Sequence, residues 1–558
     1  MISRSIKCVL ALLMAVCMVL TLAACAGNKG EQQAETTETA APSAQATEPE
    51  NTEPTATEQA TEPADTEPAP TEPPAPPALL ELPERPKLVQ IEPGAYNIKE
   101  GDELETQSTL YYLTEAGELY AMGSNQNYQL GVGNNERSPQ EVLVMDGVKS
   151  ITGGCRIFAL KEDGSLWTWG IASRWYDRKD PCGFTEPTKI LDNVIDYDSA
   201  FALTESGELW LTENYSDGTL MPVKMLEGIA SFSSDGGTQM RAVTTGGELY
   251  GYSCFMEIND DGSVSPKWDG GLSATGVKQA CCPGNFFIGT DDSLYGLEYN
   301  SSGVVPVELM DNVLNAYTGY GWVYAIKKDG SLWGWCDSDG SGLWFPSRCK
   351  GNAVKLLDNV VYVNAEYYMG EDFGVTYAIA LTADGELYGW GPNWYGELAG
   401  LDAFSMSGEQ LDTPAKIAED VKTVWSDGVN TFIIKNDNSL WGTGYNGAKG
   451  SQWEGSVGIG LDPDEGRLGD GTSETHTQDG WHMFVKITDN ARLICQRLCL
   501  VFTEYEDGTD STHTFARVFM LDTDGGVWGW GYNKDGAIAL RGDPYLLEPK
   551  PMMSPNTK

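Results

Sequence analysis

A phrase of about eleven residues recurs nine times in this chain of 558 residues, and this repeat constrains the fold most. Two copies are nearly identical: residues 160–170 read LKEDGSLWTWG and residues 326–336 read IKKDGSLWGWC. The other copies are residues 113–123, 203–213, 243–253, 288–298, 381–391, 434–444 and 521–531. Successive copies are 38 to 55 residues apart, except for one interval of 87. Periods of roughly 20–50 residues are typical of solenoids, propellers and similar arrays.

Each copy has the pattern of a β-hairpin. An alternating apolar run leads into a turn such as Asp163-Gly164, and a second alternating run with a Leu and an aromatic residue follows. Glycine accepts the positive φ that tight hairpin turns need. Further strand-like phrases, such as PTKILDNV (187–194), lie between the hairpins. Four short strands per repeat and no helical periodicity predict an all-β fold, a single closed β-propeller of about 7–9 four-stranded blades.

The phrases that follow the hairpins resemble a known family. GSNQNYQLGVGNNERSPQEV (123–142) is the fullest copy, and GWGPNWYGELAG (389–400) repeats it less completely. In the eighth repeat, WGTGYN (441–446) and GRLGDGT (466–472) are separated, which predicts an insertion at about 447–465. The pattern resembles the regulator of chromosome condensation repeat. The resemblance implies a β-propeller domain over residues 81–558, in a family whose members usually have seven blades.

Two departures limit what this resemblance implies. The chain has nine hairpins, and it lacks the family's recurrent His in the strand before each hairpin, since its three His are His476, His482 and His513. The nucleotide-exchange and chromatin roles of the family are therefore not expected. A formal net charge of −45 also argues against nucleic acid as a partner, because phosphates need a cationic surface. The segments 87–94 and 546–553 are candidates for a strand that closes the ring by pairing with the opposite end of the chain.

The first 80 residues have a different composition. Arg4 and Lys7 precede an apolar run that ends in Leu22-Ala23-Ala24-Cys25, which resembles the lipobox of bacterial lipoproteins. This predicts a lipoprotein signal peptide over residues 1–24, a lipidated Cys25 and an extracytoplasmic, membrane-anchored protein. The alternative is an ordinary secretory signal. Residues 25–80 are rich in Thr, Glu and Pro and predict a disordered stalk, because they cannot bury enough apolar surface to offset chain entropy.

Sequence motifs of catalysis are absent. The chain contains no G-x-S-x-G elbow, no H-E-x-x-H and no phosphate-binding glycine loop. The Asp-box of sialidases needs an Asp two residues before the turn glycine, where this chain has residues such as Glu162 and Lys328. We therefore predict a protein that is not an enzyme and uses no cofactor or metal.

Bulky aromatic residues recur in the loops after the hairpins. Equivalent blades place equivalent loops on one face, and aromatic residues dominate binding hot spots. The candidate ligand-binding residues are Tyr128, Trp175, Tyr176, Phe255, Trp268, Trp344, Phe345, Trp394, Tyr395 and Trp453. They predict a non-enzymatic module that binds an extracytoplasmic protein or glycan. The alternative is a cell-surface polysaccharide hydrolase or lyase that uses loop carboxylates.

A second set of aromatic residues belongs to the repeat itself. The Trp that follows the Leu of each hairpin is expected to pack between adjacent blades rather than to bind a ligand. These residues are Trp167, Trp210, Trp333, Trp441 and Trp528.

Overall fold

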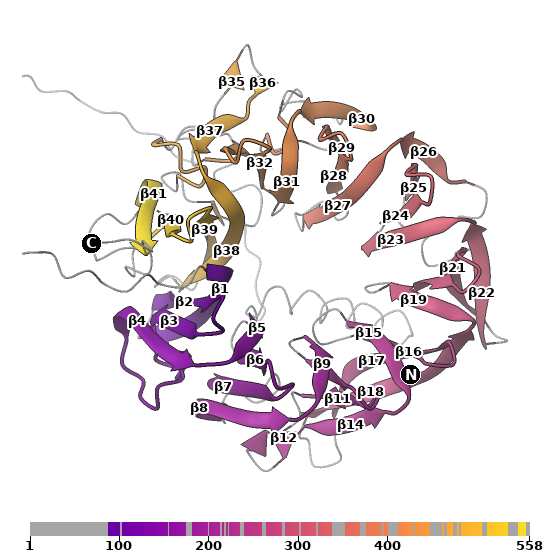
Figure 1. Cartoon of the computed structure of the whole chain (residues 1–558), viewed down its shortest axis with the longest axis horizontal. Helices are drawn as coiled ribbons and strands as arrows, with labels where there is room; N and C mark the ends of the chain where they lie inside the picture. The colour runs from indigo at the N-terminus through magenta and orange to yellow at the C-terminus, as the bar shows by residue number, and fades with distance from the viewer. Residues whose placement is uncertain are drawn as a thin grey trace, which may run out of the picture. The chain divides into compact units, whose positions relative to one another are not determined.

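The computed structural model describes residues 88–553 as β-strands joined by turns and loops, without a helix in the described part (Figure 1). Within that range the following residues are outside the description: 101–102, 154–155, 174–180, 199, 213–214, 217–218, 221, 235–238, 259–263, 282–284, 301–302, 320–321, 337–351, 369–374, 392, 394–395, 400–410, 427–428, 447–459, 462–465, 473–476, 479–480, 505–509 and 534–544. The strands form nine four-stranded antiparallel blades around one ring, which confirms the all-β propeller.

The first three blades follow each other along the chain. Blade 1 contains β1 (Leu88–Glu100), β2 (Glu103–Thr114), β3 (Leu119–Gly123) and β4 (Ser138–Met145). Blade 2 contains β5 (Val148–Gly153), β6 (Ile157–Lys161), β7 (Leu166–Ser173) and β8 (Pro181–Leu191). Blade 3 contains β9 (Val194–Tyr197), β10 (Phe201–Thr204), β11 (Leu209–Leu211) and β14 (Val223–Leu226), with the short pair β12 (Tyr215–Ser216) and β13 (Thr219–Leu220) between its last two strands.

The next three blades are uninterrupted. Blade 4 contains β15 (Ile229–Ser234), β16 (Gln239–Thr244), β17 (Glu248–Ile258) and β18 (Val264–Thr275). Blade 5 contains β19 (Val277–Cys281), β20 (Phe286–Gly289), β21 (Leu294–Asn300) and β22 (Gly303–Met310). Blade 6 contains β23 (Val313–Gly319), β24 (Trp322–Lys327), β25 (Leu332–Cys336) and β26 (Val354–Leu357).

The last three blades complete the ring. Blade 7 contains β27 (Val360–Tyr368), β28 (Val375–Thr382), β29 (Leu387–Gly391) and β30 (Leu411–Ala418). Blade 8 contains β31 (Val421–Ser426), β32 (Asn430–Lys435), β33 (Leu440–Gly444) and β37 (Val485–Thr488), with β34 (Gly460–Leu461), β35 (Thr477–Gln478) and β36 (Trp481–His482) between its last two strands. Blade 9 contains β38 (Ala491–Glu504), β39 (Asp510–Asp522), β40 (Val527–Tyr532) and β41 (Tyr545–Met553).

The ring closes without a strand exchanged between the ends of the chain. β1 is the innermost strand of blade 1 and pairs with β2, whereas β41 is the outermost strand of blade 9 and pairs with β40. Blades 9 and 1 are joined by a backbone pair between Thr503 of β38 and Glu103 of β2. The prediction of closure by segment 87–94 or 546–553 is therefore wrong. Each end of the chain completes the blade of its own repeat.

The strand-like phrases between hairpins belong to two blades at once. In PTKILDNV, residues 187–191 end the outer strand β8, and Val194 begins the inner strand β9 of the next blade. Asn193 between them has φ +56°. All eight junctions have such a residue with positive φ: Gly147, Asn193, Gly228, Gly276, Asn312, Asn359, Asp420 and Asn490. Gly and Asn are the residues that adopt this conformation at low cost.

Two backbone hydrogen bonds connect every junction to the hairpin turns beside it. At one junction, the Val360 N–H donates to the Gly330 carbonyl at 2.8 Å, and the Ala383 N–H donates to the Asn359 carbonyl at 2.9 Å. Equivalent bonds of 2.8–2.9 Å occur at all eight junctions. Hairpin turns and junctions therefore form one continuous network, which fixes each blade to the next.

The fully buried aromatic residue of the repeat lies two residues after the expected one. Trp169 and Trp530 are 0% exposed, while Trp167 and Trp528 are only half-buried. Trp169 packs in one hydrophobic cluster with Leu119 and other residues of blade 1. The second aromatic residue of the repeat thus fills the interface with the preceding blade. Of the residues expected to pack between blades, the half-buried Trp441 and Trp528 also pack against clusters that include residues of the preceding blade.

Candidate binding face

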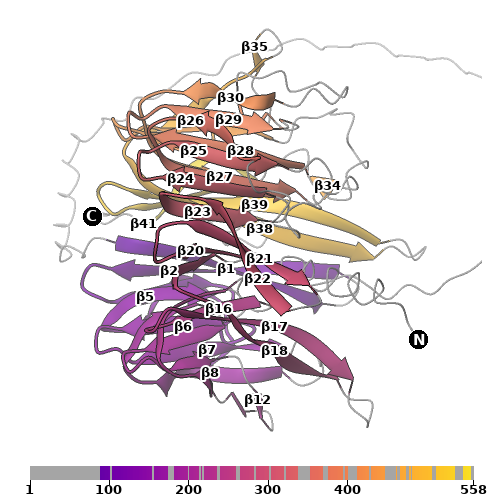
Figure 2. The same cartoon turned by 90° about the vertical axis from the view of Figure 1, so that its right-hand side faces the viewer.

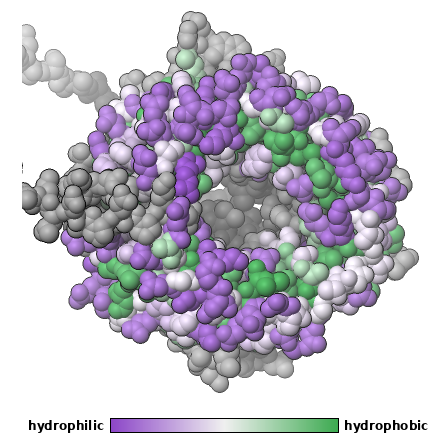
Figure 3. All heavy atoms as spheres, in the orientation of Figure 1, coloured by the Kyte–Doolittle hydropathy of each residue, from purple (hydrophilic) through white to green (hydrophobic). Residues whose placement is uncertain are grey.

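The two faces of the ring differ in what they carry. One face, here the turn face, holds the hairpin turns and the blade junctions. The opposite face, here the loop face, holds the connections between the first and second strands and between the third and fourth strands of each blade. Figure 2 shows tight turns along one edge of the ring and the ends of longer strands, such as β38 and β39, along the other. In Figure 3 hydrophilic residues dominate the turn face around a central hollow.

The phrase that carries the family resemblance forms a loop held by a buried Asn. In blade 1 the Leu130 N–H donates to Asn125 Oδ1 at 2.8 Å, and both residues are almost fully buried. Blade 7 has the same bond from Leu398 to Asn393 at 2.8 Å. Blade 8 has it from Leu468 to Asn446 at 2.9 Å, across the insertion. A buried N–H without a partner costs about 1–3 kcal/mol, so the Asn fixes the start of the loop on the loop face.

The Trp of the following blade clamps the same loop. Trp169 Nε1 donates to the Gln129 carbonyl at 2.8 Å, and Trp530 Nε1 donates to the Arg467 carbonyl at 2.9 Å. Gly131 approaches the Trp169 ring so closely that a Cβ there would lie 2.9 Å from it. Two neighbouring blades therefore hold each of these two loops, which gives this part of the loop face a rigid base.

Tyr128 occupies a position where the repeats of blades 7 and 8 have glycine. It lies two residues before the buried Leu130, as Gly396 and Gly466 lie two residues before Leu398 and Leu468. All three have positive φ, with +58° at Tyr128. An L-residue with a Cβ pays roughly 1–2 kcal/mol for this conformation. Strain of this kind clusters at functional sites, and Tyr128 is half-buried on the loop face.

The structure also places two other sequence candidates, on the long hairpin of blade 4. Phe255 lies in β17, and Trp268 lies in β18. The half-buried Trp268 ring meets the buried Phe201 ring of blade 3 edge-on, with centroids 5.4 Å apart. Part of Trp268 therefore serves packing between blades 3 and 4, and its contact with a ligand stays a prediction.

The other sequence candidates lie outside the described residues. These are Cys25, Trp175, Tyr176, Trp344, Phe345, Trp394, Tyr395 and Trp453, together with the segments 1–24 and 25–80. The described ends of the strands that flank their loops, such as Ser173 of β7 and Pro181 of β8, lie at the loop face.

Sequence reasoning missed two buried arginines beneath the loop face. Arg467 lies over the Tyr445 ring at 5.7 Å and Arg517 over the Tyr532 ring at 5.0 Å. Arg517 Nε also donates to the Tyr532 carbonyl at 2.9 Å, and both arginines are 0% exposed. The sequence contains a signal for Arg467. It directly precedes the buried Leu of its loop, at the position where blade 1 has Gln129 and blade 7 has Glu397.

A buried carboxylate also lies on the loop side of the ring. Asp198 Oδ1 accepts hydrogen bonds from the Ala200 and Phe201 N–H groups, both at 2.7 Å, and Oδ2 accepts one from the Ser234 hydroxyl of blade 4. Burial raises the pKa of Asp198, and the three hydrogen bonds oppose part of that increase. Asp198 therefore links blades 3 and 4 through its hydrogen bond with Ser234, although burying its carboxylate away from water costs free energy.

Comparison with known families supports the resemblance over part of the chain. Residues 116–159 match the regulator of chromosome condensation (RCC1) repeat. The match runs from the hairpin turn of blade 1 to the second strand of blade 2. One sequence repeat therefore covers the last two strands of one blade and the first two strands of the next. The described residues contain no helix long and apolar enough to cross a membrane.

Two curated relatives are similar to shorter parts of the chain. The RCC1 domain-containing protein RUG3, mitochondrial, of Arabidopsis thaliana is 33% identical over 122 residues, which cover 19% of this chain and 27% of the relative. The E3 ubiquitin-protein ligase HERC2 of Homo sapiens is 24% identical over 321 residues, which cover 52% of this chain and 6% of the relative. The chain thus spans about a quarter of the first relative and much less of the second.

Solved propellers align with the chain at low identity. Prp20p of Saccharomyces cerevisiae is 14% identical with a TM-score of 0.38, and the alignment covers 80% of this chain and 88% of that one. Human WBSCR16 is 13% identical with a TM-score of 0.36, and the alignment covers 78% of this chain and 94% of that one.

Proposed function

We propose that this protein is a non-enzymatic recognition module that binds a protein or glycan through its loop face. The observation that carries this proposal is the common origin of the loops: in all nine blades, the connection after the third strand begins at the loop face. The strands that lead into the loops with bulky aromatic residues therefore all end at the same face. Tyr128 also lies at the loop face, and it has a strained backbone conformation that a glycine would adopt without strain.

We further propose that the module acts outside the cytoplasm on a lipid anchor at Cys25. The support is the sequence Leu22-Ala23-Ala24-Cys25 after an apolar run, followed by a Thr-, Glu- and Pro-rich segment. A Cys25→Ser variant is expected to move from the membrane fraction to the soluble fraction and to lose labelling by a fatty acid precursor. Unchanged labelling of that variant would remove the anchor from the proposal.

The first test of binding is affinity capture from the envelope extract and culture medium of the source organism, together with a glycan array. Three baits are compared: the unmodified chain, a Trp175→Ala/Trp344→Ala/Trp394→Ala variant, and a matched control. The control is Ile195→Ala/Leu314→Ala/Val361→Ala, which truncates three apolar residues that are 54%, 59% and 56% exposed beside the turn face. Loss of one protein or glycan from the first variant alone supports the loop face. Equal loss from both variants contradicts it.

Tyr128→Gly provides a cleaner single variant. Glycine relieves about 1–2 kcal/mol of backbone strain and costs roughly 0.5–1 kcal/mol of extra chain entropy, so the free energy of unfolding should stay equal or rise slightly. If Tyr128 contacts the ligand, affinity should fall while stability does not. Urea unfolding and binding of the captured ligand measure the two effects separately. A variant that binds as tightly as the parent would exclude Tyr128 from the contact surface.

A further inference from the structure

Two lysines surround the half-buried repeat Trp in blades 2, 6 and 8. The first precedes the hairpin turn and lies over the indole ring, with Nζ 4.8–5.7 Å from the ring centroid: Lys161 over Trp167, Lys327 over Trp333 and Lys435 over Trp441. The second lies opposite the Trp on the outer strand of the same blade: Lys189, Lys355 and Lys486. In these three blades the chain itself supplies the cation that the ring attracts.

Blade 9 has neither lysine. Asp522 stands six residues before Trp528, where the other three blades have Lys, and Pro551 stands opposite it on β41. The Trp528 Nε1–H donates to Asp522 Oδ2 at 2.8 Å. Among the residues that the structure describes, no lysine or arginine lies over the Trp528 ring.

A third change in blade 9 accompanies these two. Gly526 replaces the Ser that accepts the Trp N–H in blades 2, 6 and 8. A Cβ at Gly526 would lie 2.5 Å from Asp522 Oδ2, and the Gly526 N–H donates to Asp522 Oδ1. Asp522 and Gly526 therefore form one alternative turn, in which a carboxylate rather than a hydroxyl orients the indole.

A cavity of about 590 Å³ opens beside this Trp on the turn face. Ile487, Met520 and Trp528 are the apolar part of its lining. Asp522 and Asp489 are its carboxylates, and the lining residue Lys486 is already paired with Asp489 at 2.7 Å. The cavity thus combines an open indole with one carboxylate that is not neutralised.

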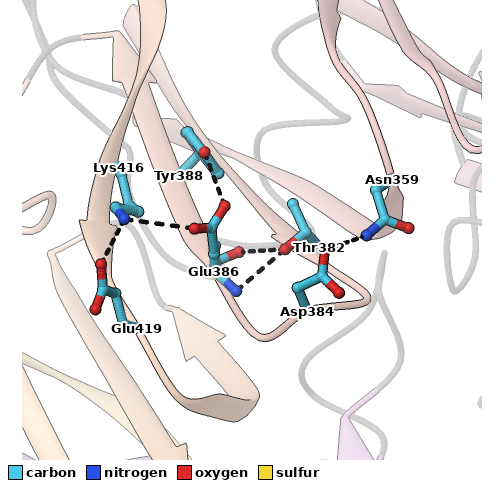
Figure 4. Close-up of polar contacts among 7 residues, drawn as sticks. All are labelled: Asn359, Thr382, Asp384, Glu386, Tyr388, Lys416 and Glu419. Carbon is cyan, nitrogen blue, oxygen red and sulfur yellow. Dashed lines mark hydrogen bonds and ion pairs between the residues drawn. The ribbon is translucent and has the colours of Figure 1, made fainter.

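Other blades neutralise a carboxylate in this region with an outer-strand lysine. Figure 4 shows blade 7, where Tyr388 donates to Glu386 and Lys416 pairs with Glu386 at 3.4 Å. Blade 3 has the same pair of a lysine and a carboxylate, with Lys224 3.1 Å from Glu208. Pro551 occupies the position of these lysines in blade 9, and in the described part of the chain no lysine or arginine pairs with Asp522. Asp522 accepts hydrogen bonds from the N–H groups of Asp524, Gly526 and Trp528 but lacks the lysine partner that the other two carboxylates have.

We propose that the cavity at Trp528 binds an alkylammonium group, either a lysine side chain of a partner protein or a small quaternary ammonium compound. The ammonium occupies the place that Lys161, Lys327 and Lys435 take in the other blades, over the indole and beside the Asp522 carboxylate. The face of an aromatic ring attracts a cation through the quadrupole of the ring. The site lies on the turn face and is independent of the loop-face function.

Fluorine NMR of the full chain labelled with 5-fluorotryptophan tests this proposal, with the Trp528 resonance assigned from a Trp528→Phe variant. Titration with tetramethylammonium chloride or with Nα-acetyl-lysine methylamide should shift that resonance saturably in the millimolar range. The neutral analogue tert-butanol and equal NaCl should not. Tighter binding of the lysine compound indicates a protein partner, and tighter binding of tetramethylammonium indicates a small-molecule ligand.

Asp522→Asn removes the charge and keeps one acceptor oxygen, either for the backbone N–H of Gly526 or for the Trp528 N–H. It should weaken binding about tenfold, equivalent to about 1.4 kcal/mol. Asp163→Asn, which makes the same change in the turn of blade 2, is the matched control and should leave the titration unchanged. Shifts of equal size with tert-butanol, no saturable shift, or unchanged affinity in Asp522→Asn would each overturn the proposal.

Discussion

Single residues decide which copies of the repeat remain purely structural. Where Lys, Ser and Trp occur together, as in blades 2, 6 and 8, the turn satisfies its own polar groups: Ser165 donates to Asp163 at 2.6 Å and accepts from Trp167 at 2.8 Å. Two copies differ from the others at one residue that we propose has a binding role. Tyr128 stands where other copies have glycine, and Asp522 stands where other copies have lysine. Comparison of the copies within the chain reveals both residues.

Asp198 gives a prediction for the pH dependence of stability. Its pKa is raised by burial, so its contribution to stability is present below the usual value of 3.8 and is lost as the pH rises through the folded-state pKa. Asp198→Asn should therefore gain stability relative to the parent as the pH rises from about 4 to 7. Asp163 has the opposite shift, because hydrogen bonds from Ser165 lower its pKa.

Asp163→Asn is thus a control of opposite sign. That variant should lose stability relative to the parent as the pH rises through the range of carboxylate titration. Urea unfolding of the parent and both variants at several pH values measures the two differences. The assignment of Asp198 as a desolvated group fails if both variants show the same pH dependence.

At the scale of the elements, the sequence predicted the hairpins but not how strands are grouped into blades. An Asp-Gly turn between alternating runs is a local signal, and the hairpin at Gly164 forms as expected, with φ +79°. PTKILDNV also has a local strand signal, but its division between blades 2 and 3 depends on the backbone at Asn193. Likewise, both Trp167 and Trp169 are aromatic, and only the packing against blade 1 shows which one becomes buried.

The sequence predicted that the candidate binding loops share one face of the ring, but it did not predict the contacts of individual residues on that face. Equivalent repeats put equivalent loops on one side, and the topology agrees. Residue detail depends on contacts that no local pattern reports, such as the packing of Trp268 on Phe201 or the strain at Tyr128. The number of blades, nine, lies within the predicted range because one hairpin corresponds to one blade.

The blade junction makes a prediction at this scale. Asn359 has φ +59°, and its side chain donates an exposed hydrogen bond to Asp384 at 2.6 Å (Figure 4). Asn359→Ala should lower the free energy of unfolding by about 1–2 kcal/mol, because alanine resists the left-handed conformation. Asn359→Gly loses the same side-chain bond but tolerates the conformation, so it should stay within about 0.5 kcal/mol of the parent. Urea unfolding compares them, and equal losses would assign the effect to the bond with Asp384 instead.

The whole molecule carries a large excess of negative charge. The formal net charge is −45, and the lysines are used in exposed pairs such as Lys189–Asp192 at 3.0 Å and Lys355–Asp358 at 2.6 Å. Exposed pairs contribute at most about 1 kcal/mol each, whereas repulsion among the excess carboxylates acts across the entire ring. The balance predicts a molecule destabilised by its own field at low ionic strength.

Raising NaCl from about 10 to about 150 mM shortens the Debye length from about 30 to about 8 Å, which screens repulsion between blades more than contacts within a pair. The thermal unfolding midpoint should therefore rise over this interval and level off above it. Sucrose is the control for general solvent effects, because it stabilises proteins by being excluded from their surface and does not screen charges. The unfolding midpoint should therefore rise with sucrose concentration without levelling off. A midpoint that stays constant or falls between these two salt concentrations would mean that the ion pairs at the blade junctions outweigh the repulsion, and that the lysines opposite the repeat aromatics hold the ring together electrostatically.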